Sequence, residues 1–196
     1  SGQELKNRHR KEPERHNREL IIIGALCVLF AFLYTTGPYP LSYNGWGDVL
    51  VIIFFGFVPV GGTYYVQALT WTPDVTIASI ICGLLIDTLL VVNNYRDREA
   101  DARSGKRTVI VRFGEKFGRY FYLALGITAS LLCLRFLSEG HFYAGLLPQL
   151  YLIPHFFTWK KMIRIYNGKK LNNILGETSR NMLLMGVLLS LGLLLG

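Results

Sequence analysis

Six long apolar runs constrain this chain more than any other feature of its sequence. They occupy residues 20–36, 48–69, 75–92, 118–137, 142–158 and 181–196. Each run has roughly the 17–25 residues that an α-helix needs to cross a hydrocarbon core about 30 Å thick. A removable signal peptide does not explain the first run, because no small-residue cleavage site follows it and five more runs come after it. We therefore predict an all-α fold, a polytopic transmembrane helical bundle over residues 20–196.

The basic residues are segregated along the chain. Of 21 Lys and Arg, six lie in residues 1–19, eight in 94–119 and six in 159–180. Two predicted spans separate the second and third clusters, so both fall on one face of the membrane. Basic loops mark the cytoplasmic face, and we expect an integral, multi-pass protein of the bacterial cytoplasmic (inner) membrane, in contact with membrane lipid.

The N-terminal residues 1–19 are highly charged, with one leucine and no aromatic residue. That composition is typical of a disordered, solvated arm, and we expect no nucleic acid as a partner. Three predicted spans separate this arm from the cluster at 94–119, which would put the arm on the opposite face. Either one early segment does not cross fully, or the arm replaces sequence that belongs to the fold.

The second span carries two breaks in its pattern. The connector 35–48, "TTGPYPLSYNGWGD", is rich in Gly, Pro, Tyr and Trp, which is typical of a structured interfacial loop. The "PVGG" segment at 59–62 is expected to interrupt the helix, and such breaks persist where backbone groups line a cavity. Tyr64, Tyr65 and Gln67 follow the break, where they form either an interfacial aromatic belt or part of a cavity lining.

The stretch "VVNNYRDREADARSGKRT" (91–108) places many charges at the end of the third apolar run. At 100° per residue, Asp87, Asn94, Asp97 and Asp101 share an arc of about 80° on a continuing helix. Asp87 lies inside the apolar run, where an ionisable group usually faces the bundle interior. This polar stripe is therefore predicted to run from the interior to the cytoplasmic surface.

The stripe ends in the components of a metal–diphosphate site. Asp97 and Asp101, at i and i+4, repel one another unless a cation lies beside them. Mg²⁺ prefers one or two carboxylates together with phosphate oxygens and water. Gly105 permits a turn, after which Lys106 and Arg107 offer donors to an anion. The alternative is a solvated loop that binds anionic lipid headgroups.

Four segments of the chain, in this order, resemble the UbiA superfamily of intramembrane prenyltransferases. They are "YTTGPYPLSYNGWGD", "GTYYVQ", "NNYRDREADARSGKRT" with "VRFG", and "ILGETSRNMLLMGVLLSLGLLL". Within the superfamily they are most similar to members that prenylate 1,4-dihydroxy-2-naphthoate in menaquinone biosynthesis. The resemblance covers most of residues 20–196.

The resemblance implies a Mg²⁺-dependent enzyme with a cavity open to the lipid. It would transfer a polyprenyl group from a polyprenyl diphosphate to the dihydroxynaphthoate ring, which loses its carboxylate to give demethylmenaquinone. Asp97 and Asp101 are implied as catalytic and metal-linked residues. The resemblance also implies residues around the diphosphate, which are Asn93, Asn94, Arg96, Lys106 and Arg107. Weaker candidates for the aromatic or prenyl pocket are Tyr64, Tyr65 and Gln67.

One departure from the family pattern bears on activity. The family has nine helices and an earlier aspartate-rich motif, and the six runs correspond to its fourth to ninth helices. We therefore expect a C-terminal two-thirds of such an enzyme, with half of its metal site. The alternatives are a non-catalytic remnant, one half of a split complex, or a prenyltransferase with another aromatic acceptor. A CDP-alcohol phosphotransferase is disfavoured, because residues 75–101 lack its D-G-x-x-A-R segment.

Other polar residues in the runs have simpler expected roles. Three single cysteines inside predicted spans suggest neither a zinc site nor a disulfide framework. His155 is expected to be structural. Glu177 and Arg180, three residues apart, are spaced to form an ion pair at the start of the last helix.

Overall fold

The computed structural model describes the backbone of residues 2–35 and 41–196, and the side chains of residues 18–34 and 41–196. The chain divides into two compact units, Ser1–Leu41 and Ser42–Gly196. Helix α1 (Gly2–Thr35) belongs to the first unit and contains the first apolar run up to residue 35. The backbone of residues 2–19, where the composition predicts a disordered arm, lies in α1. The division of the chain at residue 19 stays a prediction.

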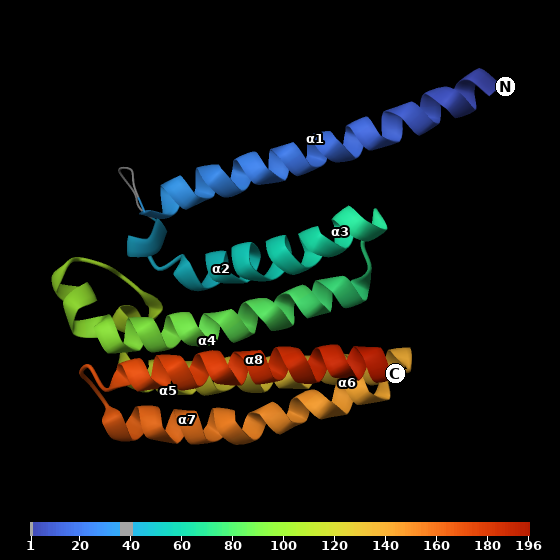
Figure 1. The fold of residues 1–196 in the computed structure, drawn as a ribbon. Helices are drawn as coiled ribbons and strands as arrows, with labels where there is room; N and C mark the ends of the chain where they lie inside the picture. The colour runs from blue at the N-terminus through green and yellow to red at the C-terminus, as the bar shows by residue number, and fades with distance from the viewer. Residues whose placement is uncertain (1, 36–40) are drawn as a thin grey trace. The chain divides into compact units, whose positions relative to one another are not determined.

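Helices make up the regular structure described in the second unit, and none of its described residues forms a strand. In chain order they are η1 (Leu41–Tyr43), α2 (Gly47–Val51), η2 (Ile52–Gly61), α3 (Gly62–Ala68), α4 (Pro73–Arg103), α5 (Val109–Cys133), η3 (Leu134–Glu139), α6 (Phe142–Leu146), η4 (Leu147–Tyr151), α7 (Leu152–Ile165) and α8 (Leu171–Leu195). Helix α4 runs between the α2–α3 segment on one side and α5 and α8 on the other (Figure 1).

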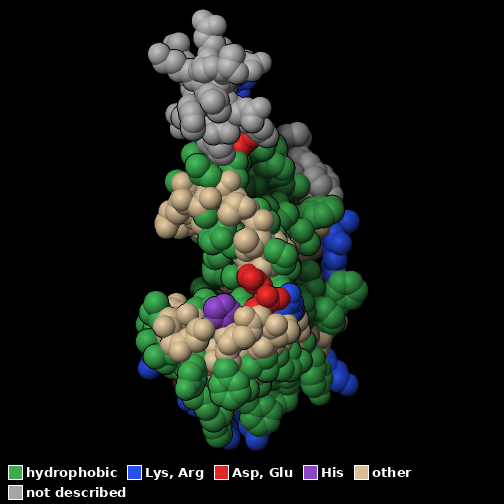
Figure 2. Space-filling model, turned by 90° about the vertical axis from the view of Figure 1, so that its right-hand side faces the viewer, with side chains coloured by type: hydrophobic (Ala, Val, Ile, Leu, Met, Phe, Trp, Pro, Cys, Tyr) green, Lys and Arg blue, Asp and Glu red, His purple; other side chains and the backbone are tan. Residues whose placement is uncertain are grey.

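Four helical stretches of the described chain are long and apolar enough to cross a membrane. They are Gly47–Ala68, Pro73–Arg103, Val109–Glu139 and Leu171–Leu195. Hydrophobic side chains also cover most of the face seen in Figure 2. The prediction of an all-α, polytopic membrane bundle is therefore confirmed.

The fifth predicted run is not a single helix. Residues 142–158 fall in α6, the 3₁₀ segment η4 and the first half of α7. Pro148 is the second residue of η4. Because proline lacks an N–H and its ring clashes with the carbonyl four residues earlier, it prevents a continuous α-helix here.

The helices also extend well beyond the apolar runs. Helix α4 begins where Thr72 accepts a hydrogen bond from the Val75 N–H at 3.3 Å, and it continues through the charged stretch to Arg103. Helix α5 begins at Val109, after Thr108 caps it in the same way, and it is kinked at Gly114, where φ is +85°. Capping satisfies terminal N–H groups, so a threonine outside the apolar run fixes where each of these helices begins.

The second span continues through "PVGG" instead of breaking there. Residues 52–61 form the π-helix η2, with Pro59 inside it. In a π-helix each N–H bonds to the carbonyl five residues earlier, and Pro59 has no N–H for this bond. The Cys82 thiol of α4 donates to the Phe55 carbonyl at 3.6 Å, so this part of η2 also contacts the neighbouring helix.

Small residues let η2 and α4 approach closely in an antiparallel register. A Cβ added to Gly56 would lie 2.3 Å from the Ser79 carbonyl oxygen, and one added to Gly83 would lie 2.8 Å from the Ile52 Cα. Such contacts between small residues are typical of helix pairs in membranes. Gly56 therefore lies opposite Ser79, and Ile52 lies opposite Gly83. Moving four more residues along each antiparallel helix places Asp48 opposite Asp87.

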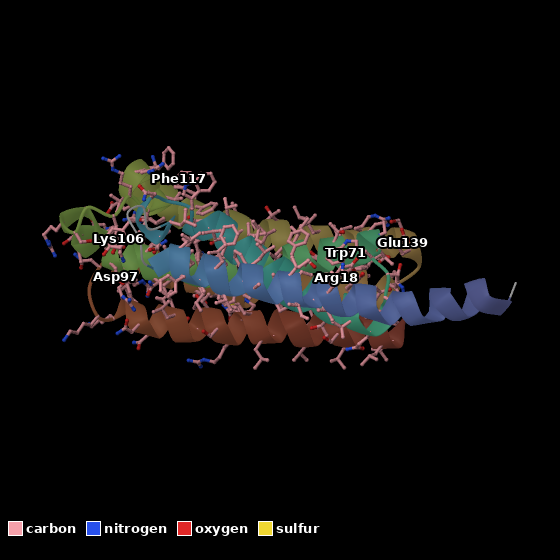
Figure 3. The ribbon with its side chains drawn as sticks, turned by 90° about the horizontal axis from the view of Figure 1, so that it is seen from above. Arg18, Trp71, Asp97, Lys106, Phe117 and Glu139 are labelled. Carbon is pink, nitrogen blue, oxygen red and sulfur yellow. The ribbon has the colours of Figure 1, made fainter. Side chains whose placement is uncertain are left out.

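The two basic clusters of the second unit meet at one end of the bundle, which we call the basic end (residues 94–119 and 159–180). Arg96 contacts Asn172, and the Trp159 indole donates to the Arg119 carbonyl at 2.8 Å. Figure 3 shows Asp97 and Lys106 at this end and Trp71 and Glu139 at the other. The shared face predicted from the charge pattern is therefore present.

Candidate functional site

The last turns of α4 carry the two aspartates of the charged stretch. Asp87, Asn94 and Asp101 are buried on one face of the helix, as the predicted arc requires. Asp97 lies at the margin of that face, and 37% of its side chain is exposed, against 10% for Asp101. The stripe therefore emerges from the interior at the basic end.

Arg96 is held at four points. Its Nε donates to Asp97 Oδ1 at 2.8 Å, and one terminal nitrogen donates to Asp97 Oδ2 at 2.6 Å. That nitrogen also donates to Asn93 Oδ1 at 2.7 Å, and the other donates to Asn172 Oδ1 on α8 at 2.8 Å. A bidentate guanidinium–carboxylate pair is among the stronger side-chain contacts, so Arg96 has a defined orientation.

The loop after α4 brings Lys106 back over the helix end. Gly105 has φ +79°, a conformation that suits glycine, and the Lys106 N–H donates to the Asp101 carbonyl at 2.9 Å. Lys106 Nζ then lies 3.1 Å from Asp101 Oδ1 and 5.3 Å from the centre of the Tyr43 ring. Arg107 holds the same loop through its backbone N–H, which donates to the Tyr43 carbonyl at 2.7 Å.

A cluster of Arg and Tyr side chains lies beside this site. The guanidinium carbons of Arg98 and Arg119 lie 5.0 and 5.3 Å from the centre of the Tyr166 ring. Arg119 also donates to the Tyr95 hydroxyl at 3.0 Å and to Glu115 at 3.2 Å. Glu115 raises the pKa of Tyr166 above its usual range, because it accepts a hydrogen bond from the protonated phenol and because its negative charge opposes formation of the phenolate. These contacts fix the α7–α8 connection against α4 and α5.

Two carboxyl groups also meet inside the bundle. Asp87 is fully buried and Asp48 is 8% exposed, and the two side chains interact across the α2–α4 contact. Within the described part of the chain, both Asp87 oxygens and Asp48 Oδ1 have no hydrogen-bond partner. A buried carboxyl without partners is costly, so this pair is a locally unfavourable feature of the span.

Polar residues elsewhere in the bundle have structural partners. Tyr151 and His155 share a hydrogen bond at 2.9 Å, and the His155 ring lies against Gly126, as expected for a structural histidine. Glu177 pairs with Lys161 at 2.9 Å. The expected pair of Glu177 with Arg180 is therefore wrong, since the Arg180 Nε donates instead to a backbone carbonyl of its own helix.

The structure brings some predicted site residues together and separates others. Asn93, Arg96 and Asp97 form one set of contacts, and Asp101 and Lys106 form another on the following turn. Asn94 is buried in the same helix, and Arg107 is exposed in the adjoining loop. Tyr64, Tyr65 and Gln67 lie on α3, which adjoins the start of α4 at the opposite end of the span. Their role in a substrate pocket stays a prediction.

Two residues of this region escaped sequence reasoning. Asn172 has no sequence signal, because only the docking of α8 brings it to Arg96. Asp48 did have a sequence signal, because it is the first residue of an apolar run. The argument used for Asp87, that an ionisable group in an apolar run usually faces the bundle interior, applies to Asp48 as well.

The donor set at the basic end suits a hard cation that keeps other ligands. Asp97 and Asp101 supply carboxylate oxygens from one helix face. The described residues contain no group of three or more His, Cys, Asp or Glu that could hold a metal ion. Two carboxylates without a full cage fit Mg²⁺, which retains water and phosphate oxygens.

An apolar groove runs between η2, α4 and α8. Its volume is about 660 Å³, and its walls include Val60, Ile81, Leu85, Met182 and Met185. Ile86, also in the wall, lies 11 residues before Asp97 on α4. At 1.5 Å per residue, the groove begins roughly 16 Å along the helix from the charged site.

Comparisons with known proteins agree with this arrangement. The UbiA prenyltransferase family matches residues 16–175. The 1,4-dihydroxy-2-naphthoate octaprenyltransferase of Haemophilus influenzae is 36% identical over 177 residues, which cover 89% of this chain and 57% of the relative. The Escherichia coli K12 protein of the same name is 40% identical over 114 residues, covering 58% of this chain and 37% of the relative.

A eukaryotic protein matches over a similar range. The UbiA prenyltransferase domain-containing protein 1 of Dictyostelium discoideum is 29% identical over 176 residues, which cover 90% of this chain and 52% of the relative. This chain therefore spans about half the length of the relatives that match most of it. No solved structure matches the chain significantly.

Proposed function

We propose a function that starts from one fact: this chain belongs to the UbiA prenyltransferase family. In this proposal, residues 91–108 bind the diphosphate of a polyprenyl donor together with Mg²⁺. The observation that carries the proposal is the convergence of Asp97, Asp101, Arg96 and Lys106 at one end of the apolar bundle. Carboxylates for a metal beside cations for an anion are what a metal–diphosphate complex requires.

The acceptor is a dihydroxynaphthoate-type aromatic ring. This part of the proposal is supported by the printed names of the bacterial relatives. In the reaction, the bond between the allylic carbon and the diphosphate oxygen breaks, and the electron pair leaves with the diphosphate. A ring carbon forms the new carbon–carbon bond and releases its carboxylate as CO₂, which restores the aromatic ring and gives the hydroquinone, that is, the reduced form of demethylmenaquinone.

The residues of the chain have separate tasks in this scheme. Asp97 and Asp101 would hold Mg²⁺, which when bound neutralises charge on the departing diphosphate. Arg96 and Lys106 donate to phosphate oxygens and stabilise the same negative charge. The apolar groove between η2, α4 and α8 takes the polyprenyl tail, because it is lined by hydrophobic side chains and starts within reach of the charged site.

Isosteric substitutions test the proposal. Asp97→Asn and Asp101→Asn should each lower transfer of labelled prenyl diphosphate to dihydroxynaphthoate by at least ~100-fold, the usual effect of losing a preorganised electrostatic contact. Chelation of Mg²⁺ should abolish transfer. Glu99→Gln is the matched control, since Glu99 is exposed on the same turn of α4, and it should retain activity. Wild-type turnover in either aspartate variant would refute the site.

A further inference from the structure

Both carboxylates of the candidate site already have a cationic partner from the chain itself. Arg96 binds both oxygens of Asp97, at 2.8 and 2.6 Å. Lys106 Nζ lies 3.1 Å from Asp101 Oδ1. Two negative and two positive charges therefore cancel inside the site before any ligand arrives.

This arrangement suits neither ligand on its own. A divalent cation alone would displace the guanidinium and the ammonium from the carboxylates and leave four positive charges close together. A diphosphate alone would draw Arg96 and Lys106 away and leave two bare carboxylates beside an anion. Like charges at contact distances repel strongly where water is partly excluded.

Both ligands together restore the balance. The cation takes the carboxylate oxygens of Asp97 and Asp101, and the phosphate oxygens take the cationic side chains. Every charge then keeps an opposite partner, and the bonds to ionised groups are of the stronger kind.

We propose that Arg96 and Lys106 are exchangeable counter-ions, which make a divalent cation and a diphosphate bind this site cooperatively. The inference rests on the proposed function, because it uses the same two ligands, and it adds how they depend on each other. Each ligand binds weakly alone and tightly with the other. Couplings between two ligands commonly change affinity about 5- to 150-fold, and the change is reciprocal.

The contacts around the two cations suit such an exchange. Asn93 and Asn172 accept hydrogen bonds from Arg96 at 2.7 and 2.8 Å, so amide oxygens keep the guanidinium at the mouth of the site when it leaves Asp97. Lys106 is one-third exposed and follows Gly105, and its flexible stem allows the ammonium to turn toward an anion. Asn93 and Asn172 are therefore positioning residues.

Binding measurements on the purified chain in detergent test the exchange without an activity assay. Mn²⁺ serves as the cation probe, followed by the electron paramagnetic resonance signal of the free ion. Inorganic pyrophosphate serves as the anion probe, with free concentrations corrected for the Mn²⁺–pyrophosphate complex in solution. In the wild-type protein, pyrophosphate should tighten Mn²⁺ binding about 5- to 150-fold.

Removing the positive charge of Arg96 or Lys106 should tighten the binding of Mn²⁺ alone. It should also reduce the effect of pyrophosphate on Mn²⁺ binding. Arg96→Gln should bind Mn²⁺ alone about 10-fold more tightly than the wild type, which corresponds to ~1.4 kcal/mol of relieved competition. Pyrophosphate should then tighten Mn²⁺ binding by no more than about 2-fold, below the usual range of such couplings. Lys106→Gln should behave in the same direction, and it serves as the second variant if Arg96→Gln fails to fold.

Matched control variants also remove one positive charge, but at positions that do not pair with Asp97 or Asp101. Arg135→Gln removes an arginine that is ion-paired with Glu139 at the other end of the bundle, and Lys161→Gln removes a lysine paired with Glu177 near the basic end. Both should bind Mn²⁺ and pyrophosphate as the wild type does.

The outcomes separate this inference from the proposed function. If Arg96→Gln and Lys106→Gln bind Mn²⁺ no more tightly than the wild type, and pyrophosphate still tightens binding, the exchange is overturned and the metal–diphosphate site stands. If the wild-type chain binds neither probe, the proposed site itself fails and the exchange fails with it.

Discussion

The contact between η2 and α4 allows a stability prediction with an internal reference. Gly56 and Gly62 lie in the same span, six residues apart. A Cβ added to Gly56 would lie 2.3 Å from the Ser79 carbonyl oxygen, whereas a Cβ added to Gly62 meets nothing within 4 Å. Gly56→Ala and Gly62→Ala therefore make the same chemical change in a closed and an open environment.

The expected magnitudes follow from two effects. Alanine in place of glycine favours a helix by about 1 kcal/mol at either position. At Gly56 the added methyl group also overpacks the helix contact, which costs about 1–3 kcal/mol. Because the obstacle is a backbone oxygen, no rotamer change relieves it. Gly62→Ala should thus be up to ~1 kcal/mol more stable than the wild type, and Gly56→Ala up to ~2 kcal/mol less stable.

The difference between the two variants isolates the overpacking term. It should be about 1–3 kcal/mol, or roughly 5- to 140-fold in the unfolding equilibrium constant. Reversible unfolding by SDS in mixed micelles, followed by far-ultraviolet circular dichroism, measures it. A Gly56→Ala protein as stable as Gly62→Ala would show that η2 and α4 are not in this close register.

Two further predictions concern groups with unusual surroundings. Asp87→Asn should raise stability in the same SDS assay by about 0.5–1.5 kcal/mol, because the amide cannot ionise in the buried site and can donate a hydrogen bond to Asp48. Asp74→Asn, in the first turn of α4, should lower stability by ~0.3–1 kcal/mol. An Asp87→Asn protein less stable than the wild type would show that the two carboxyl groups are not an unfavourable pair. Glu115 raises the pKa of Tyr166, so the stabilising contact is present below pH ~10 and is lost as the pH rises through the raised value. Near-ultraviolet titration of the wild type against Tyr166→Phe should show this tyrosine ionising late, and Glu115→Gln should bring its ionisation back toward pH 10; an unchanged titration in Glu115→Gln would exclude the carboxylate as the cause.

The membrane-spanning character of the fold was predictable because it depends on local composition. The runs at 48–69, 75–92, 118–137 and 181–196 each correspond to a long apolar helix. Their ends were not predictable from hydropathy, since threonine caps and charged turns extend α4 and α5 beyond the apolar residues. Proline also had different effects at two positions: Pro148 divides a helix, whereas Pro59 lies inside the π-helix η2, which continues past it.

The candidate site was predictable where its residues lie close in sequence. Asp97, Asp101 and Lys106 fall within ten residues, so helix geometry and one glycine turn suffice to bring them together. Asn172 and Asp48 come from other helices, and their contacts depend on how α8 and α2 pack on α4. Sequence spacing carries no information about such packing.

The hydrogen bond between Arg96 and Asn172 also has a consequence for how the protein is made. It joins residues 76 positions apart, whereas the bonds from Arg96 to Asp97 and Asn93 are local to α4. Contacts of long sequence separation form late, because a long loop must close first. During synthesis, α4 and α5 are complete before α8 emerges. A nascent chain can therefore contain all of residues 91–108 while Arg96 is bonded only to its neighbours on α4. The set of contacts around Arg96 is then completed when α8 packs against α4.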